Sequence, residues 1–291
     1  MSKAIASPRA LLARLVKLTS TIPGLDASLM LAQYSSPLII TLLLRLAQFR
    51  AAHPRIRMGG GKASGGFGLV KLAEGWAKAA GSIGDARVIM RAFGLLPIIQ
   101  WLLALHPNPL LSLKRLLTLQ VSPSSLSLRN EKTLSTLQIV SLLCYYPLEH
   151  AAWLGSKGVL PLSLTSMGKA SLWSVRFWAL YVMLTLYKIR QTHSSLSSRT
   201  REYKAQAKIE KAEGYELQES SQSAETRLAS SQSLKKEWQM WSNSVLVNAG
   251  YAPLTVHWST PGGLWTNPLF TSVFGSMAAV GQLQAEWRKG E

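Results

Sequence analysis

Long apolar runs, separated by basic and polar segments, dominate the chain. The C-terminal block from Pro253 to Trp287 has the clearest pattern: residues 258–285 carry no formal charge, and residues 269–283 are mainly apolar or small. A membrane-spanning helix needs about 20 predominantly apolar residues, and tryptophans and basic residues favour its ends. The pattern therefore predicts a C-terminal transmembrane helix, with a buried helix of a large soluble core as the alternative.

Three further apolar runs precede this block. Residues 37–49 form a run that Arg45 interrupts before it reaches the length of a span, so we interpret it as an embedded or packed helix. Residues 134–146 meet Pro147, which predicts a kinked span or a hairpin entering from one leaflet. Residues 172–187 resemble a membrane helix with a basic flank after its end.

Between residues 69 and 96 the apolar positions follow a helical period and basic residues occupy other positions. Glycines at 81 and 84 interrupt this pattern and predict two amphipathic helices. Two interpretations remain open, since such helices pack in a protein core or lie at a membrane surface with cations at the headgroups. The residues that this second interpretation assigns to lipid contact are Lys71, Trp76, Lys78, Arg87, Arg91 and Phe93.

The four compositional regions predict four parts. Residues 1–132 form a basic amphipathic helical region, and residues 133–187 a membrane-embedded helical region. Residues 188–240 are polar and mixed in charge, and their Ser/Gln tract at 219–233 predicts a disordered linker. Residues 241–291 form the anchor. The fold class expected is an all-α integral membrane protein with amphipathic interfacial helices and a C-terminal transmembrane helix.

Charge supports a membrane partner. The chain has 47% hydrophobic but only 16% charged residues, against about a quarter charged in an average domain, and its net charge is +18. Residues 1–132 hold 17 of the 32 basic side chains and 4 of the 14 acidic ones. A chain that is both apolar and basic suits an anionic phospholipid membrane. Nucleic-acid binding is not expected, because no recognisable module interleaves basic and aromatic residues.

Candidate chemistry is sparse. Cys144 is the single cysteine, so no intramolecular disulfide or cysteine-based metal site is expected. The glycine-rich segment 53–68 fails the phosphate-loop pattern, because Ile56 replaces its first glycine and Ala63 its final hydroxyl residue, and a flexible linker is predicted instead. Glu149 beside His150 is interpreted as a polar pair at a membrane interface rather than an acid/base pair. No catalytic residue, metal or cofactor is expected.

Three ordered stretches resemble the peroxisomal biogenesis factor 11 (peroxin-11) family, most closely its divergent fungal branch. They are GSIGDARVIMRAFGLLPIIQWL at 81–102, YYPLEHAAWLGSKGVLP at 145–161, and PLTVHWS with GGLW within 253–265. The resemblance implies a peroxisomal membrane protein that elongates the membrane before fission, inserts an amphipathic helix into anionic lipid and self-associates. It also implies fission adaptors and a dynamin-related GTPase as partners.

Self-association has a candidate surface in the C-terminal helix. Ser272 and Ser276, and likewise Gly275 and Ala279, repeat at i, i+4, a small-residue spacing that lets helices approach closely. This spacing predicts a homo-oligomer held through that face. The alternative function is a channel or transporter for small metabolites in an organelle membrane, lined by Glu149, His150, Lys169 and Arg176.

Overall fold

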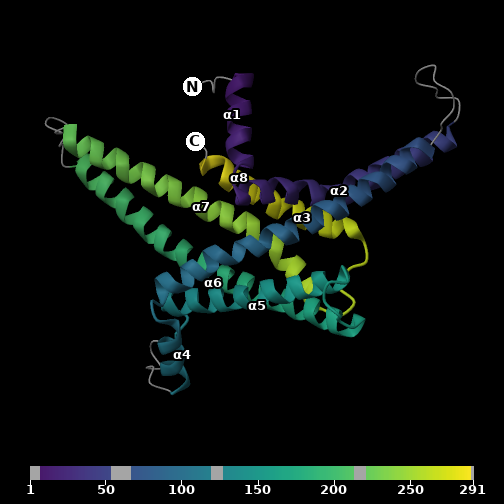
Figure 1. Cartoon of the computed structure of the whole chain (residues 1–291). Helices are drawn as coiled ribbons and strands as arrows, with labels where there is room; N and C mark the ends of the chain where they lie inside the picture. Colours follow the sequence, from purple (N-terminus) through teal and green to yellow (C-terminus); the bar gives the residue numbers. More distant parts are fainter. Residues whose placement is uncertain (1–6, 54–66, 119–126, 213–220, 290–291) are drawn as a thin grey trace.

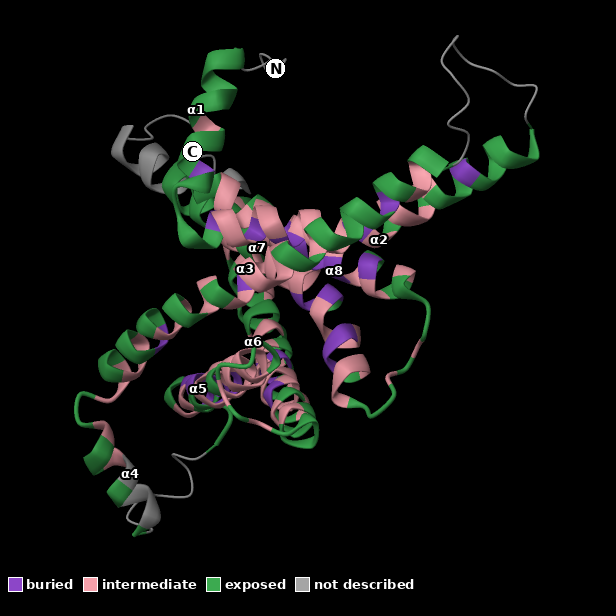
Figure 2. Cartoon of the chain, turned by 45° about the vertical axis from the view of Figure 1, so that its right-hand side comes forward, coloured by how far each residue is buried: buried purple, intermediate pink, exposed green. Residues whose placement is uncertain are grey.

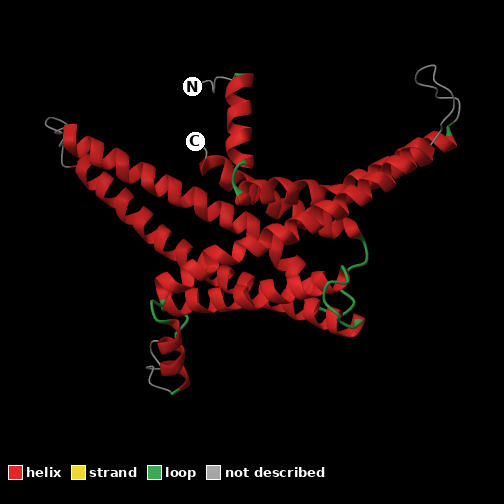
Figure 3. Ribbon diagram, in the orientation of Figure 1, coloured by secondary structure: helices red, strands yellow, loops and turns green. Residues whose placement is uncertain are grey.

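The computed structural model describes residues 7–53, 67–118, 127–212 and 221–289, and the regular elements in these residues are all helices (Figure 3). The all-α fold class is therefore confirmed. The glycine-rich segment predicted as a linker lies mostly outside the described residues. The helices in chain order are α1 (Pro8–Thr19), α2 (Ile22–Ala52), α3 (Phe67–Leu105), α4 (Pro109–Leu117), α5 (Glu131–Ser156), α6 (Leu164–Ala212), α7 (Ser221–Ser259) and α8 (Pro268–Lys289).

Local capping fixes several helix starts. The Ser7 side chain accepts the backbone N–H of Ala10 at the start of α1, and Thr21 does the same for Gly24 at the start of α2. A proline in the first turn of each helix suits its fixed φ angle. Asn130 caps α5, accepting from Lys132 N at 2.9 Å. The N-cap of α2 directly follows the C-cap of α1, so a short bend rather than a loop connects these two helices.

Proline and glycine do not break the apolar helices. Pro37 lies inside α2, Pro147 inside α5, and Gly81 and Gly84 inside α3. The prediction of two helices within 69–96 is therefore wrong, since α3 continues through both glycines. Each glycine costs a helix about 1 kcal/mol relative to alanine, which tertiary contacts along the rest of α3 can offset.

The polar region 188–240 is also largely helical. Residues 188–212 extend α6 and residues 221–240 belong to α7, so the prediction of disorder in 219–233 is wrong from residue 221 onward. The two helices pack against each other. Trp238 Nε1 donates to Thr200 Oγ1 at 3.0 Å, and Trp241 Nε1 donates to the Ile189 carbonyl at 3.0 Å. Composition alone does not reveal these contacts, because they join residues that lie far apart in the sequence.

Two helical arms diverge from a central layer (Figure 1). The end of α2 and the beginning of α3 form one, here named the α2–α3 arm (residues 38–52 and 67–80). The end of α6 and the beginning of α7 form the other, named the α6–α7 arm (residues 190–212 and 221–241). In the centre, α8 packs on α2 and α7, while α5 packs on α3 and α6. Helix α4 projects alone, and α1 stands beside the end of α8.

The core is small and lies where the central helices meet (Figure 2). Met30 of α2 and Ala278 and Ala279 of α8 are fully buried, with Tyr34 and Tyr251 packed around them. Trp178 of α6 continues this core, with its ring centroid 5.0 Å from that of Tyr251. Much of the two arms and of α1 is exposed, as are Leu110 and Leu111 of α4, so the described residues leave much apolar side-chain surface uncovered.

The helices with the length and composition of a span are α2 and α3, among the described residues. Their mean hydropathies over the most apolar windows are 1.5 and 1.9. Helix α8 does not meet this criterion, so the expected C-terminal transmembrane helix is not shown. Its apolar stretch is diluted by small and polar residues, and the buried face of these residues contacts α2 and α7. Conversely, the run at 37–49 belongs to a helix long enough to span a membrane, because α2 already begins at Ile22.

Candidate membrane-contacting surface and its polar support

Large apolar side chains cover the outside of α2 and α3. Only 6% of the most apolar window of α3 is buried, and 17% of that of α2. Monomeric soluble proteins rarely expose continuous apolar patches of this kind, whereas a lipid environment accommodates them. The exposed members are Leu38, Leu42, Leu44, Leu46 and Phe49 on α2, and Phe67, Leu72, Trp76, Ile89, Phe93, Leu96, Ile99 and Leu103 on α3.

Basic residues accompany this surface on the α2–α3 arm. Lys71, Lys78, Arg45 and Arg50 are all exposed there. The Lys71 ammonium lies 4.7 Å from the centroid of the Phe67 ring, a cation–π distance. Long basic side chains beside aromatic rings are typical of residues at a membrane–water interface.

Four of the six residues assigned to lipid contact are exposed on α3. Lys71, Lys78 and Phe93 lie open, and Trp76 is 38% exposed, with its Nε1 donating to Ser36 Oγ at 3.1 Å. The interfacial position expected for them is thus compatible with the fold. Their contact with lipid stays a prediction.

Arg87 and Arg91 do not lie where the amphipathic pattern placed them. Arg87 is 6% exposed, and its guanidinium donates to Asp26 and to Gln33 of α2, each at 2.8 Å. Arg91 donates to both carboxylate oxygens of Glu149 of α5, at 2.7 and 2.8 Å. The expectation that both face the headgroups is wrong, because each is held by an acidic partner on a neighbouring helix.

These ion pairs fix α3 between α2 and α5. Tyr145 adds a hydrogen bond from its hydroxyl to Glu149 at 2.9 Å. Further along, Asp85 accepts from Trp153 Nε1 at 2.9 Å and from Lys157 Nζ at 2.6 Å. Buried charges require such pairing, so the network determines the position of α3 even though little of its apolar surface is covered.

The network contains residues that the sequence interpretation did not single out, or to which it assigned a different role. Asp26, Gln33 and Tyr145 were not singled out, and Glu149 was assigned to an interface. The Nδ1 and Nε2 atoms of His150 instead lie 2.6 and 3.0 Å from the Tyr146 and Val88 carbonyl oxygens, respectively. The signal was available, because isolated acidic and basic residues in apolar helices usually pair with one another. Which acid pairs with which base depends on the tertiary arrangement.

The small-residue face of α8 has a partner within the chain. Ser272 Oγ donates to the Tyr34 carbonyl, and a Cβ on Gly275 would overlap the Tyr34 ring. Ala279 is fully buried in the core, and Ser276 Oγ is buried with no hydrogen-bond partner among the described residues. The close helix approach predicted from the spacing occurs, with α2 as the neighbour. Self-association through this face stays a prediction.

The turn between α7 and α8 is organised by His257. Its Nδ1 accepts the backbone N–H of Leu264 at 2.8 Å, and its ring stacks on Trp265 with centroids 4.0 Å apart. Gly263 has φ of +73°, and a Cβ there would overlap the imidazole. The HWS and GGLW residues noted in the sequence therefore shape a turn that returns α8 to the core.

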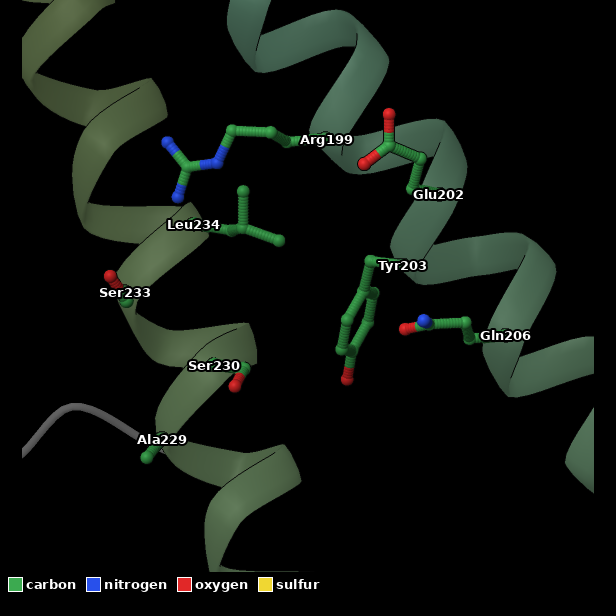
Figure 4. Close-up of a pocket in the computed structure, with 8 residues that line it drawn as sticks. All are labelled: Arg199, Glu202, Tyr203, Gln206, Ala229, Ser230, Ser233 and Leu234. Carbon is green, nitrogen blue, oxygen red and sulfur yellow. The ribbon is translucent and has the colours of Figure 1, made fainter.

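An open pocket of about 490 Å³ separates the helices of the α6–α7 arm (Figure 4). Arg199 on its wall already pairs with Glu237 of α7, at 2.6 and 2.9 Å. The hydrogen bond from Arg199 lowers the pKa of Glu237. The remaining wall is of mixed polarity and contains Glu202, Tyr203, Gln206, Ala229, Ser230, Ser233 and Leu234. It is the space between two diverging helices, with no concentrated charge or converging catalytic groups.

Residues 71–244 match the model of the family described as peroxisomal biogenesis factor 11 (PEX11). The match runs from the start of α3 into α7, so it includes the network around Arg91 and Glu149 and two of the three resembling stretches; the stretch at 253–265 lies outside it. Comparisons with curated proteins and with solved structures gave no match. Since the matched region covers more than half of the chain, the protein belongs to the PEX11 family of peroxisomal membrane proteins, which is associated with peroxisome proliferation and fission.

Proposed function

We propose that this protein elongates and curves the peroxisomal membrane before fission. In this proposal α2 and α3 are embedded in lipid, and the α2–α3 arm places its cations at anionic headgroups. The observation that carries the proposal is the outward position of the large apolar side chains of α2 and α3 beside Lys71 and Lys78. An arm that occupies one leaflet more than the other expands that leaflet and favours curvature.

The ion-pair network supports this role mechanically. Arg87 and Arg91 tie the second half of α3 to α2 and α5, while Lys71 and Lys78 lie on the half that extends away from the centre. An arm held rigidly at its base transmits its position in the leaflet to the whole bundle. The lipid-contacting set that we propose is accordingly Lys71, Trp76, Lys78 and Phe93.

Self-association and recruitment of fission adaptors and a dynamin-related GTPase complete the proposal. Several copies inserted in the same leaflet expand it more, and so favour curvature more, than a single copy does. Because the small-residue face of α8 already packs on α2, association through it requires the exchange of α8 between copies, as in domain swapping. Partner binding is proposed from the family alone and has no assigned surface here.

Replacing Lys71 and Lys78 by glutamate should weaken binding of the full-length protein to anionic vesicles. Each cation near an anionic surface contributes about 1 kcal/mol, so losing two predicts a loss of roughly 30-fold. Co-sedimentation of purified protein with phosphatidylserine-containing vesicles measures binding, and electron microscopy of the same vesicles measures tubule length. The expected result is weaker binding and shorter or fewer tubules.

The matched control replaces Lys204 and Lys208, two exposed lysines of the α6–α7 arm, by glutamate. It makes the same change in net charge on the other arm and should leave tubulation near the parent level. Equal losses in both double variants would mean that total charge, not the α2–α3 arm, drives lipid binding. Unchanged tubulation by the Lys71/Lys78 variant would refute the role of the arm.

A further inference from the structure

The α6–α7 arm distributes its charges unevenly between its two sides. Among its described side chains, at 190–209 and 228–241, the acidic residues are Glu202 and Glu237. Both belong to the side that opens into the pocket, since Glu202 lines the pocket and Glu237 pairs with Arg199 of its wall (Figure 4). The exposed basic residues in the same ranges are Arg190, Arg199, Arg201, Lys204, Lys208, Lys235 and Lys236.

Helix α6 places a row of cations on the side away from the pocket. Lys204 is two residues from both Glu202 and Gln206 of the pocket wall. A step of two residues turns an α-helix by about 200°, so Lys204 points away from that wall. Arg201 and Lys208 lie three residues before and four residues after Lys204, and therefore share its face.

Helix α7 adds a cation to the same side. Lys235 is two residues from Ser233 of the pocket wall and two from Glu237, so it also lies opposite the pocket. On α6, Arg190 precedes Lys208 by 18 residues, about five helical turns, and returns to the same face. We name this surface the basic side of the arm. It consists of Arg190, Arg201, Lys204, Lys208 and Lys235.

The cations of the basic side are not neutralised within the described part of the chain. The ion pair of the arm, between Arg199 and Glu237, lies on the pocket side. Arg201 and Lys204 are spaced i, i+3, and Lys204 and Lys208 are spaced i, i+4, so each pair of like charges repels and weakens the helix. A solvated helix face commonly mixes both signs of charge and avoids this repulsion. A bound row of carboxylates would relieve it.

The two helices of the arm hold this surface in place. Trp238 of α7 donates through Nε1 to Thr200 of α6, and Arg199 donates to both carboxylate oxygens of Glu237. Leu196, also on α6, is 1% exposed. A surface that is already fixed loses little conformational freedom when a partner binds, which favours affinity.

The residues between the cations favour a protein partner over lipid. Leu228, 61% exposed, is the one large apolar residue among the described side chains of the basic side. A helix that lies in a membrane interface needs a broad apolar arc beside its cations, and this side lacks one in the part described. From Arg190 to Lys208 the row is about 27 Å long, and a second helix laid alongside can repeat its spacing with carboxylates.

We propose that the basic side of the α6–α7 arm docks an acidic helix of a partner protein, whose carboxylates pair with Arg201, Lys204, Lys208 and Lys235. The α2–α3 arm contributes no residue to this surface, and the inference does not rest on the proposed curvature role. Tubulation of vesicles by the purified protein involves no such partner. Changes at Lys204 and Lys208 are therefore expected to affect docking and not tubulation.

Binding of a designed acidic peptide to the full-length protein in neutral detergent micelles tests this proposal. The probe is a fluorescein-labelled alanine-rich helix of about 18 residues with glutamates along one face, and fluorescence anisotropy measures its affinity. We expect saturable binding, with affinity roughly tenfold weaker or less for the same peptide with glutamine in place of glutamate. A peptide of identical composition with its glutamates spread around the helix should also bind several-fold more weakly. Equal binding of the one-faced and spread peptides would overturn the proposal without any change to the protein.

Lys204→Gln/Lys208→Gln should weaken binding of the one-faced peptide by roughly tenfold. The matched control is Lys169→Gln/Lys236→Gln, which removes the same charge from exposed positions of the same two helices outside the basic side. Its affinity should stay within about twofold of the parent. Equal weakening by both double variants would reduce the effect to net charge and overturn the docking surface.

Co-sedimentation with phosphatidylserine-containing vesicles distinguishes a protein partner from lipid. Lys204→Gln/Lys208→Gln should bind these vesicles as the parent does. A loss of vesicle binding as large as the loss of peptide binding would assign the basic side to lipid and overturn the proposal. Failure of the α2–α3 arm in the tubulation test would leave the peptide result unaffected, so the two proposals fail separately.

Discussion

Asp26→Ala is expected to destabilise the protein by about 3 kcal/mol or more, because it leaves the buried Arg87 guanidinium without its carboxylate. The Arg87 side chain is 7% exposed and that of Asp26 24%. Gln33 would remain as a neutral acceptor at 2.8 Å, which cannot offset the charge. The loss should separate α3 from α2 at the base of the α2–α3 arm.

Denaturant unfolding of full-length protein in mixed micelles, followed by tryptophan fluorescence, measures this loss. Asp26→Leu/Arg87→Met serves as the compensating control, since replacing both partners by apolar residues removes the unpaired charge and should recover most of the stability. Asp26→Asn should fall between the parent and Asp26→Ala. If Asp26→Ala unfolds at the same denaturant concentration as the parent, the ion pair does not hold α3.

Gly275→Leu is expected to cost about 1–3 kcal/mol by forcing a side chain into the Tyr34 ring of α2. The helices approach so closely that even a Cβ would overlap there, so relief requires α8 to move away from α2. The displaced helix would also lose the Ser272 hydrogen bond to the Tyr34 carbonyl. The same unfolding measurement checks this result.

Val273→Leu is the matched control, because Val273 is 53% exposed on the same helix and has room for a larger side chain. Co-purification of two differently tagged copies of Gly275→Leu separates the intramolecular role of this face from an intermolecular one. Reduced stability with unchanged co-purification would confine the face to packing within the chain. Reduced co-purification with unchanged stability would contradict the packing described here and support an oligomer contact.

Both predictions concern contacts that hold the helices together, rather than the residues that we propose to contact lipid. The exposed residues of α2 and α3 supply contact with lipid, whereas the pairs Asp26–Arg87 and Arg91–Glu149 fix the angle of the helices that carry them. Variants of the network should therefore change stability first and tubulation as a consequence. Variants of Lys71 and Lys78 should change lipid binding with little effect on stability, since both side chains are exposed.

The sequence by itself determined the helical class, the apolar and basic character of the chain, and the family. Apolar runs and helical periods predict helices because their spacing follows from backbone geometry alone. The exposure of Lys71 and Lys78 on α3 also followed from that period, which places both opposite the apolar face. The small residues of α8 do allow a close helix contact, which the structure forms with α2, while the predicted self-association through this face stays a prediction.

Only the tertiary structure decided which partner each of these faces meets. Arg87 and Lys78 both read as surface cations by period, yet one is buried because Asp26, 61 residues away in the chain, lies opposite it. The small-residue face of α8 meets α2 and α7 within the chain, and residues 221–240 are helical because α6 packs beside them. Each outcome depends on the free energy of contacts between distant segments, which no local pattern contains.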